Sequence, residues 1–164
     1  MIGRFTGRND WATRPSQWFD PRELAMLPQC NEMRDPSIIF HHTACYVRQP
    51  FRELVLPVLQ PVESTPERVY RVGRVRRNVY IKRICESPFN SVITPWEDAI
   101  RLVELRGLRQ YPNCGGFFFM QAKYDKIMVV RLTWSPSRNK WYIYACFPND
   151  ALLFPGCLIF SPKI

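Results

Sequence analysis

Apolar side chains recur at helical spacing after the Thr-Pro-Trp-Glu sequence at 94–97. Ala99 and Val103 fall on one face of a helix, and Gly107 follows where a left-handed C-terminal cap is favoured. The sequence at 94–97 supplies an N-cap threonine, a proline at the first helical position and a capping box. The pattern therefore predicts a helix over 95–106.

Alternating polar and apolar residues predict strands on both sides of this helix. Before the helix, the alternation covers 68–72 and 78–84. After it, a β-branched apolar run covers 127–134, and a second alternating run covers 140–147. A turn at 135–139 separates these two runs, and the last apolar segment of the chain is predicted to be extended.

Weaker signals predict four further elements. Helix-like spacing of Phe117, Met120 and Tyr124 predicts a second helix over 117–126. The remaining elements are a short helix from Asp20 to Met26, and two extended runs at 37–40 and 44–47.

Prolines divide the chain into three zones. The sequence has 15 prolines against 7 glycines, which excludes long uninterrupted helices over much of its length. We predict a proline-rich N-terminal arm with aromatic anchors over 1–66 and a core domain of strands and helices over 67–136. A C-terminal strand and extended tail complete the chain over 137–164. The mixture of predicted elements places the fold in the α+β class.

The chain is strongly basic. It has 23 Lys and Arg against 14 Asp and Glu, a net charge of +9, and 18 of the 23 basic residues are arginine. Arginine binds phosphate through two parallel hydrogen bonds and stacks on bases. This composition indicates a nucleic acid or another acidic partner; a solvated basic surface is the alternative.

The basic residues cluster in one tract, residues 68–83, and at the exit of the predicted helix. Tyr70 and Tyr80 are interleaved with the tract, where they could stack on unpaired bases or face a core as strand residues. The predicted RNA-binding residues are Arg68, Arg71, Arg74, Arg76, Arg77, Lys82, Arg83, Arg106, Arg109 and Lys123.

Catalytic and metal-binding patterns have little support. His41 and His42 are adjacent, so on a strand they point to opposite faces. A nucleophilic pair of His42 with Cys45 lacks a recognisable orienting group, and packed or exposed histidines are the alternative. The carboxylates show no metal-binding spacing, and the six cysteines form no C-x-x-C pair. We predict no catalytic residue, metal, cofactor or small-molecule substrate, and therefore no enzyme.

Membrane and targeting signals are weak. No apolar run reaches the roughly 18–20 residues that a membrane helix needs. The first residues have no apolar stretch of the secretory kind, but they carry Arg4, Arg8 and Arg14 with little acid. That composition is weakly similar to an organellar presequence.

The segment 78–134 resembles the universal ribosomal protein family L-thirty of the large subunit, especially its mitochondrial forms. The family helix closes with Leu-Gly-Leu-Arg/Lys, and this chain has Arg-Gly-Leu-Arg at 106–109. The first position of that signature differs, and the loop at 112–116 lacks the valine-rich strand of the family. The corresponding elements are a first strand over 79–84, a turn over 86–89, the helix over 95–106, a second helix over 117–126 and a last strand over 128–134.

The resemblance implies a small ferredoxin-like βαβ core with an antiparallel sheet, and the proline-rich extended N- and C-terminal arms lie outside the family core. It also implies a structural constituent of the mitochondrial large ribosomal subunit, located in the matrix, with ribosomal RNA and neighbouring ribosomal proteins as partners. Lys82, Arg83, Arg106 and Arg109 would then face the RNA. One alternative is a non-catalytic accessory subunit of another large organellar or viral assembly without nucleic acid. A second is a small nuclease that uses His41 or His42.

Overall fold

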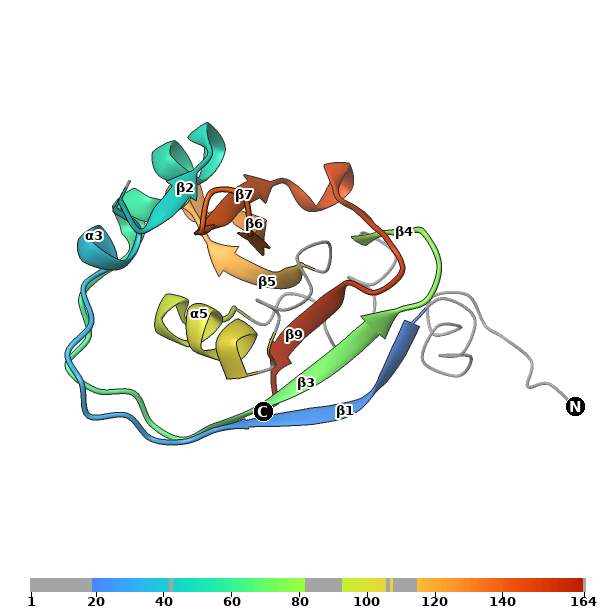
Figure 1. Cartoon of the computed structure of the whole chain (residues 1–164), viewed down its shortest axis with the longest axis horizontal. Coiled ribbons are helices and arrows are strands. Elements are labelled where there is room, and N and C mark those ends of the chain that lie inside the picture. Colours follow the sequence, from blue (N-terminus) through green and yellow to red (C-terminus); the bar gives the residue numbers. More distant parts are fainter. Residues whose placement is uncertain (1–18, 42, 82–92, 106, 108–114, 164) are drawn as a thin grey trace, which may run out of the picture.

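A seven-stranded sheet is the main element of the structure, which is a computed structural model (Figure 1). The structure describes residues 19–41, 43–81, 93–105, 107 and 115–163. In spatial order the strands are β1 (Phe19–Leu27), β3 (Arg68–Val75), β9 (Leu158–Pro162), β5 (Gly116–Gln121), β6 (Ile127–Ser135), β7 (Lys140–Cys146) and β2 (Cys45–Val47).

The sheet is mixed. Neighbouring strands are antiparallel except that β5 runs parallel to β9, and β2 runs parallel to β7. A separate two-stranded sheet pairs β4 (Val79–Tyr80) with β8 (Leu152–Leu153). The helical elements are α3 (Pro36–Ile39), the π-helical η1 (Phe51–Val55), α5 (Trp96–Leu105), and the 3-10 turns η2 (Leu56–Val58), η4 (Lys123–Asp125) and η5 (Pro148–Asp150). None of the helices in the described ranges is long and apolar enough to cross a bilayer.

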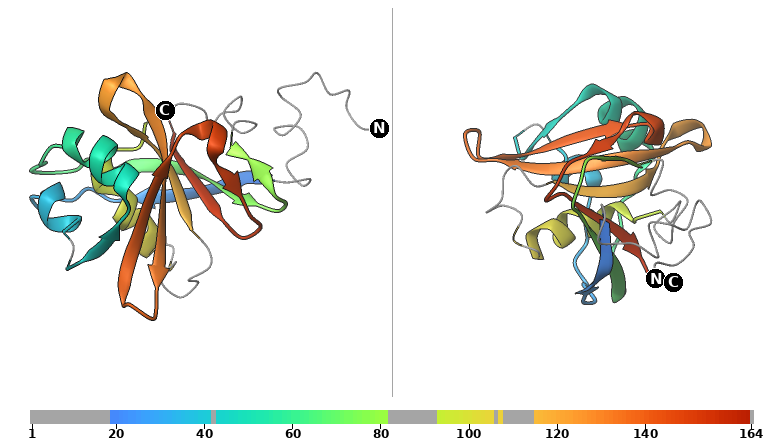
Figure 2. Two further views of the ribbon diagram at one scale, coloured as in Figure 1. Left: turned by 90° about the horizontal axis from the view of Figure 1, so that it is seen from above. Right: turned by 90° about the vertical axis from the view of Figure 1, so that its right-hand side faces the viewer.

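The main hydrophobic core lies between the sheet and α5. Figures 1 and 2 show α5 in the bend of the sheet, with β5 to β7 on one side and β1 and β3 on the other. Leu102 and Val103 of α5 are fully buried in this core, and the rings of Phe118 and Phe160 stack with centroids 5.1 Å apart. A side chain at Gly116 would place its Cβ only 2.5 Å from Val103, so glycine permits the close approach of α5 to β5.

The opposite face of the sheet holds a second, smaller core. Phe117 and Phe119 of β5 pack there with residues of β9 and of the β4–β8 pair, whereas Phe118 and Met120 belong to the main core. A strand that is buried on both faces has a continuous apolar sequence without alternation. The predicted helix over 117–126 is therefore wrong, and its first part is β5.

Two other local predictions are also wrong. The segment from Asp20 to Met26 is part of β1, because its pairing with β3 overrides the local preference for a helix. In this strand Ala25 is buried and Leu24 is exposed. The run at 37–40 forms most of α3 instead of an extended segment. Asp35 caps that helix by accepting a hydrogen bond from the Ser37 N–H at 2.9 Å.

The strongest local patterns are confirmed. The helix predicted over 95–106 is α5, and Gly107 has the left-handed φ of +68°. The capping box is not formed, because the buried Thr94 Oγ1 has no hydrogen-bond partner among the described residues. The strands predicted over 68–72, 127–134, 140–147 and 44–47 correspond to β3, β6, β7 and β2. Of the strand predicted over 78–84, β4 is present, and residues 82–84 lie outside the described ranges.

The sheet crosses the predicted domain boundaries at 66 and 136. The first zone contributes β1 and β2 to the common sheet, and its residues Phe40, Phe51 and Val55 are buried in the main core. The last zone contributes β7 and β9. The α+β class is confirmed, whereas a ferredoxin-like core with proline-rich arms is not, since the described parts of both predicted arms are strands and core of one sheet.

Candidate nucleic-acid interface

Two rows of neighbouring side chains cross the sheet face that points away from α5. In the first row, Arg131 of β6 lies between Phe117 of β5 and Tyr144 of β7. In the second row, Tyr142 of β7 lies between Thr133 of β6 and Tyr46 of β2. Because paired residues point to the same side of a sheet, these side chains stand beside one another. With two flanking arginines they form the tyrosine–arginine face: Tyr46, Arg48, Phe117, Arg131, Thr133, Arg138, Tyr142 and Tyr144.

Three arginines lie against the rings of this face. Cation–π geometry places the Arg48 Cζ 5.4 Å from the centroid of Tyr144, and the Arg138 Cζ 5.3 Å and 5.9 Å from the centroids of Tyr46 and Tyr142. The Arg131 Cζ lies 5.6 Å and 5.9 Å from the centroids of Phe117 and Tyr144. At an exposed site, as for Arg48 and Arg138 on Tyr144 and Tyr46, such a contact stabilises by only about 0.5–1 kcal/mol. These two guanidinium groups can therefore exchange a ring for a ligand at little cost.

These arginines also carry unneutralised charge. None of the three forms an ion pair with an acidic side chain in the described part of the chain; the pairs there involve Arg34, Arg68 and Arg74. Two of the rings are accessible, with Tyr46 41% exposed and Tyr144 37% exposed, whereas Phe117 is buried. The face therefore offers aromatic surface together with arginines that have no acidic partner among the described residues.

Local sequence explains how the face is assembled. In β7 the apolar residues Trp141 and Ile143 point into the main core, so Tyr142 and Tyr144 point outward. Asn139, with a left-handed φ of +52°, forms part of the turn between β6 and β7 that carries Arg138. The Arg48 N–H donates to the Ile143 carbonyl at 2.9 Å, which continues the pairing of β2 with β7.

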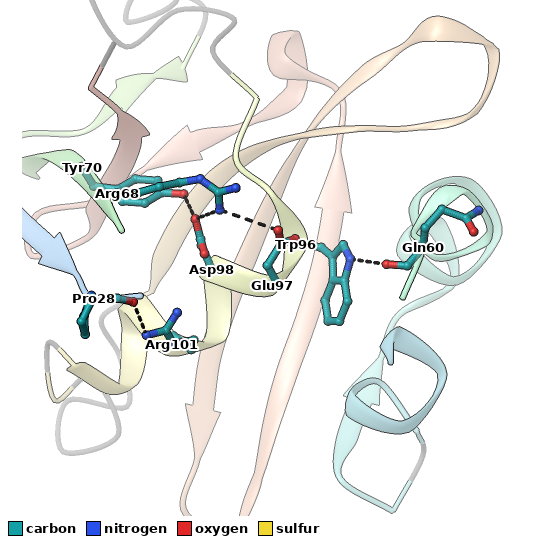
Figure 3. Close-up of polar contacts among 8 residues, drawn as sticks. All are labelled: Pro28, Gln60, Arg68, Tyr70, Trp96, Glu97, Asp98 and Arg101. Carbon is teal, nitrogen blue, oxygen red and sulfur yellow. Dashed lines mark hydrogen bonds and ion pairs between the residues drawn. The ribbon is translucent and has the colours of Figure 1, made fainter. Parts of the chain in front are cut away.

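Arg68, the first residue of the predicted basic tract, points into the molecule (Figure 3). Its Nη1 lies 2.5 Å from Asp98 Oδ2 and 3.6 Å from Glu97 Oε1, and the Tyr70 hydroxyl donates to the same Asp98 oxygen. Tyr70 and Asp98 are fully buried. Burial alone would lower the pKa of Arg68, but the hydrogen bond and charge of Asp98 raise it, while burial and the same carboxylate raise the pKa of Tyr70.

This buried cluster is structural. It joins β3 to α5, and the cavity of about 570 Å³ beside Arg68 is lined by Glu67, Val69, Pro162 and Lys163 but not by Asp98. Of the two interleaved tyrosines, Tyr70 is thus a core residue, and Tyr80 is half exposed on β4.

The other predicted RNA-binding residues do not form one surface. Arg74 is exposed and lies 3.6 Å from Glu23, whereas Arg71 points to the opposite face of β3. Arg76 and Arg77 are exposed just after β3, and Lys123 is half-buried in η4. The remaining four, Lys82, Arg83, Arg106 and Arg109, lie outside the described residues.

None of the residues of the tyrosine–arginine face is among those that the sequence predicts to bind RNA. One usable signal was present, since the alternation Trp-Tyr-Ile-Tyr-Ala at 141–145 places two tyrosines on one side of a strand. A second was the occurrence of Arg131 and Thr133 two residues apart in an otherwise apolar strand. Neither signal identifies Tyr46 or Arg48, which reach the face through the parallel pairing of β2 with β7.

The environment of Cys45 does not favour its role as a nucleophile paired with His42. Its thiol is buried and donates to the Ile39 carbonyl at 3.2 Å, and burial raises its pKa to about 11. His41 contacts Thr43 Oγ1 at 3.0 Å, and His42 lies outside the described residues. Cys45 is therefore a protonated thiol near neutral pH, which is a poor nucleophile.

Alkylation rates should separate Cys30 from Cys45. A backbone hydrogen bond at Glu32 and the side chain of Arg34 lower the pKa of Cys30, so a larger thiolate fraction is present at pH 8 than for Cys45. We expect iodoacetamide to modify Cys30 much faster than Cys45, as measured by peptide mass spectrometry of the folded protein. Equal rates in the folded protein would contradict the burial of Cys45; denaturant should remove the difference.

Comparison with known proteins adds no relative: no protein-family model, curated protein or solved structure matches this chain. The fold and the site define an α+β protein whose mixed sheet presents a basic aromatic surface. The functional proposal therefore rests on that surface.

Proposed function

We propose that this protein is a non-catalytic RNA-binding subunit of a ribonucleoprotein particle. The observation that supports it is the tyrosine–arginine face, where Tyr46, Tyr142 and Tyr144 share one sheet surface with three arginines that lack acidic partners among the described residues. Single-stranded RNA is bound by stacking bases on aromatic rings and guanidinium planes of this kind. The net charge of +9 attracts the phosphate backbone.

The particle that we propose is the large subunit of the mitochondrial ribosome, with ribosomal RNA and neighbouring ribosomal proteins as partners. Its support is the resemblance around α5 and the left-handed Gly107. The second helix that the resemblance requires is β5. The RNA-binding class consequently rests on the tyrosine–arginine face, and the ribosomal and matrix assignment rests on the resemblance alone.

Removing two rings should weaken RNA binding. We expect Tyr142→Ser with Tyr144→Ser to reduce affinity for a short single-stranded RNA by about 1–3 kcal/mol for each lost ring, as measured by fluorescence anisotropy. Tyr80→Ser removes a half-exposed tyrosine from β4 and is the matched variant, with little expected effect. A larger loss of RNA affinity for Tyr80→Ser than for the double variant would indicate that the RNA binds near β3 and β4 and not at the tyrosine–arginine face.

Salt dependence gives an independent check on the same complex. Each phosphate contact made by an arginine contributes to the negative slope of log K against log salt. Arg138→Ala should reduce that slope, because Arg138 lies over the face without an ion pair among the described residues. A flat plot for the unmodified protein would argue against phosphate-dominated binding.

A second candidate function is an accessory subunit that binds protein and no nucleic acid. The observation in its favour is β1, the edge strand of the sheet, on which Leu24 is 51% exposed and Met26 is 61% exposed on the same face. An edge strand with exposed apolar side chains favours contact with another chain. RNase treatment before sedimentation discriminates the two: RNase-sensitive cosedimentation with a large particle supports RNA binding, and RNase-insensitive cosedimentation supports the second candidate.

A further inference from the structure

One end of the tyrosine–arginine face opens into a cavity of about 250 Å³. Its floor is the sheet, and its wall is η5 with the start of β8, which cross over that face. This volume lies below the range of about 300–1,000 Å³ that is usual for drug-sized ligands, and it suits a single flat group. The lining residues are Phe117, Val129, Arg131, Tyr144, Ala145, Cys146, Asp150, Ala151 and Leu152.

The cavity has a donor wall and an acceptor wall. Arg131 lies against the rings of Phe117 and Tyr144, and its buried Nε has no hydrogen-bond partner within the described ranges. Asp150 is exposed on η5 and forms no ion pair with a described residue. The pKa of the nearby Cys146 thiol is raised, mainly by the burial of that thiol and also by the negative charge of Asp150. Arg131 and Asp150, neither of which forms an ion pair with a described residue, thus line one small cavity together with the rings of Phe117 and Tyr144.

We infer that this cavity binds the guanine base of a single-stranded RNA, an inference that rests on the proposed RNA-binding function. Guanine presents two acceptors, O6 and N7, which an arginine binds in bidentate fashion. Its Watson–Crick edge presents N–H donors that a carboxylate accepts, and its ring stacks on aromatic and guanidinium planes. Each wall of the cavity therefore has a counterpart on this base.

Other ligands match less well. A phosphate group would meet the Asp150 carboxylate, which repels it. Adenine carries an amino group beside its N7. This amino donor would face the donor groups of the arginine. Cytosine also carries an amino donor in place of a carbonyl acceptor. Uracil has a single ring N–H between two carbonyl oxygens, and these oxygens would be repelled by the carboxylate.

The test compares short oligouridines that carry guanosine, adenosine or cytidine at one central position, using fluorescence anisotropy with the full chain. We expect about tenfold tighter binding of the guanosine-containing RNA than of plain oligouridine, within the discrimination of a good bidentate pair. Asp150→Ala should bring this ratio close to one. The matched variant Glu63→Ala removes an exposed carboxylate outside the cavity and should keep the ratio.

The outcomes separate this inference from the proposed function. Binding of all four RNAs with equal affinity would overturn the guanine site and leave RNA binding in place. No binding of any RNA would overturn the proposed function and the inference with it. A preference that survives Asp150→Ala would also overturn the site. A further outcome is that free guanosine monophosphate competes as strongly as the guanosine-containing RNA does. That result would assign the cavity to a free nucleotide and contradict the inference that its ligand is part of an RNA.

Discussion

Replacement of Arg68 by methionine is expected to destabilise the protein by about 3–5 kcal/mol, the usual cost of leaving one partner of a buried ion pair uncompensated. Asp98 is fully buried, and its Oδ2 accepts from both Arg68 and Tyr70. Without the guanidinium, the carboxylate keeps the Tyr70 hydroxyl, and the nearby Glu97, which is 8% exposed, adds a second negative charge. Urea unfolding followed by tryptophan fluorescence measures the loss.

Two further variants show whether the buried charge is the cause. Asp98→Asn in the Arg68→Met background removes the uncompensated charge, so it should recover part of the lost stability. Arg74→Met removes a more exposed arginine from the same strand, where the side chains of Arg74 and Glu23 are 48% and 41% exposed and 3.6 Å apart. Such a surface pair contributes about 0–1 kcal/mol. Equal costs for Arg68→Met and Arg74→Met would contradict the structural role of Arg68.

Arg68 and Arg74 also show what residue type cannot reveal. Both are arginines of β3 in one basic stretch of sequence. One is held by a buried carboxylate of α5 and the other by a surface glutamate of β1. The partner of each lies on an element distant in sequence, so charge composition predicts a basic protein without predicting which arginines remain available to a ligand.

Local signals predicted those elements whose stability is largely local. The helix α5 follows from its apolar spacing and its C-terminal glycine, and β6 and β7 follow from β-branched and alternating runs around a short turn. The errors lie where tertiary contacts decide. β5 is apolar throughout because both of its faces are buried, and β1 is extended because it pairs with β3.

The candidate site could not be predicted for a related reason. Its rings and arginines come from β2, β5, β6 and β7, and they become neighbours only through strand register. A shift of one residue in the pairing of β2 with β7 would turn Tyr46 into the core. The alternation in β7 predicts two outward tyrosines, but the register that places Arg131 beside Tyr144 is a property of the assembled sheet.

Replacement of Trp96 by alanine is expected to cost about 3–5 kcal/mol, as is typical for a buried aromatic side chain. Trp96 begins α5, and its indole N–H donates to the Gln60 carbonyl at 2.8 Å (Figure 3). Its ring makes an edge contact with Phe40, with ring centroids 6.0 Å apart, and the centroids of Phe40 and the buried Phe51 are 5.1 Å apart. One side chain thus joins α5 to Phe40 and Gln60, which belong to the segment that sequence alone assigns to a separate arm.

Thermal unfolding of Trp96→Ala distinguishes a shared core from a docked arm. Because Phe40, Phe51 and Val55 are buried in the same cluster as α5, the variant should unfold in a single transition at lower temperature. Trp96→Phe keeps a ring and loses the hydrogen bond to Gln60, so its cost should be smaller, near the 0.5–1.5 kcal/mol of a typical hydrogen bond plus a packing loss. Two separate transitions, or a negligible cost for Trp96→Ala, would show that the first zone folds as an independent arm. A single transition would mean that β2, which carries Tyr46 to the tyrosine–arginine face, is held in place by the same core as α5.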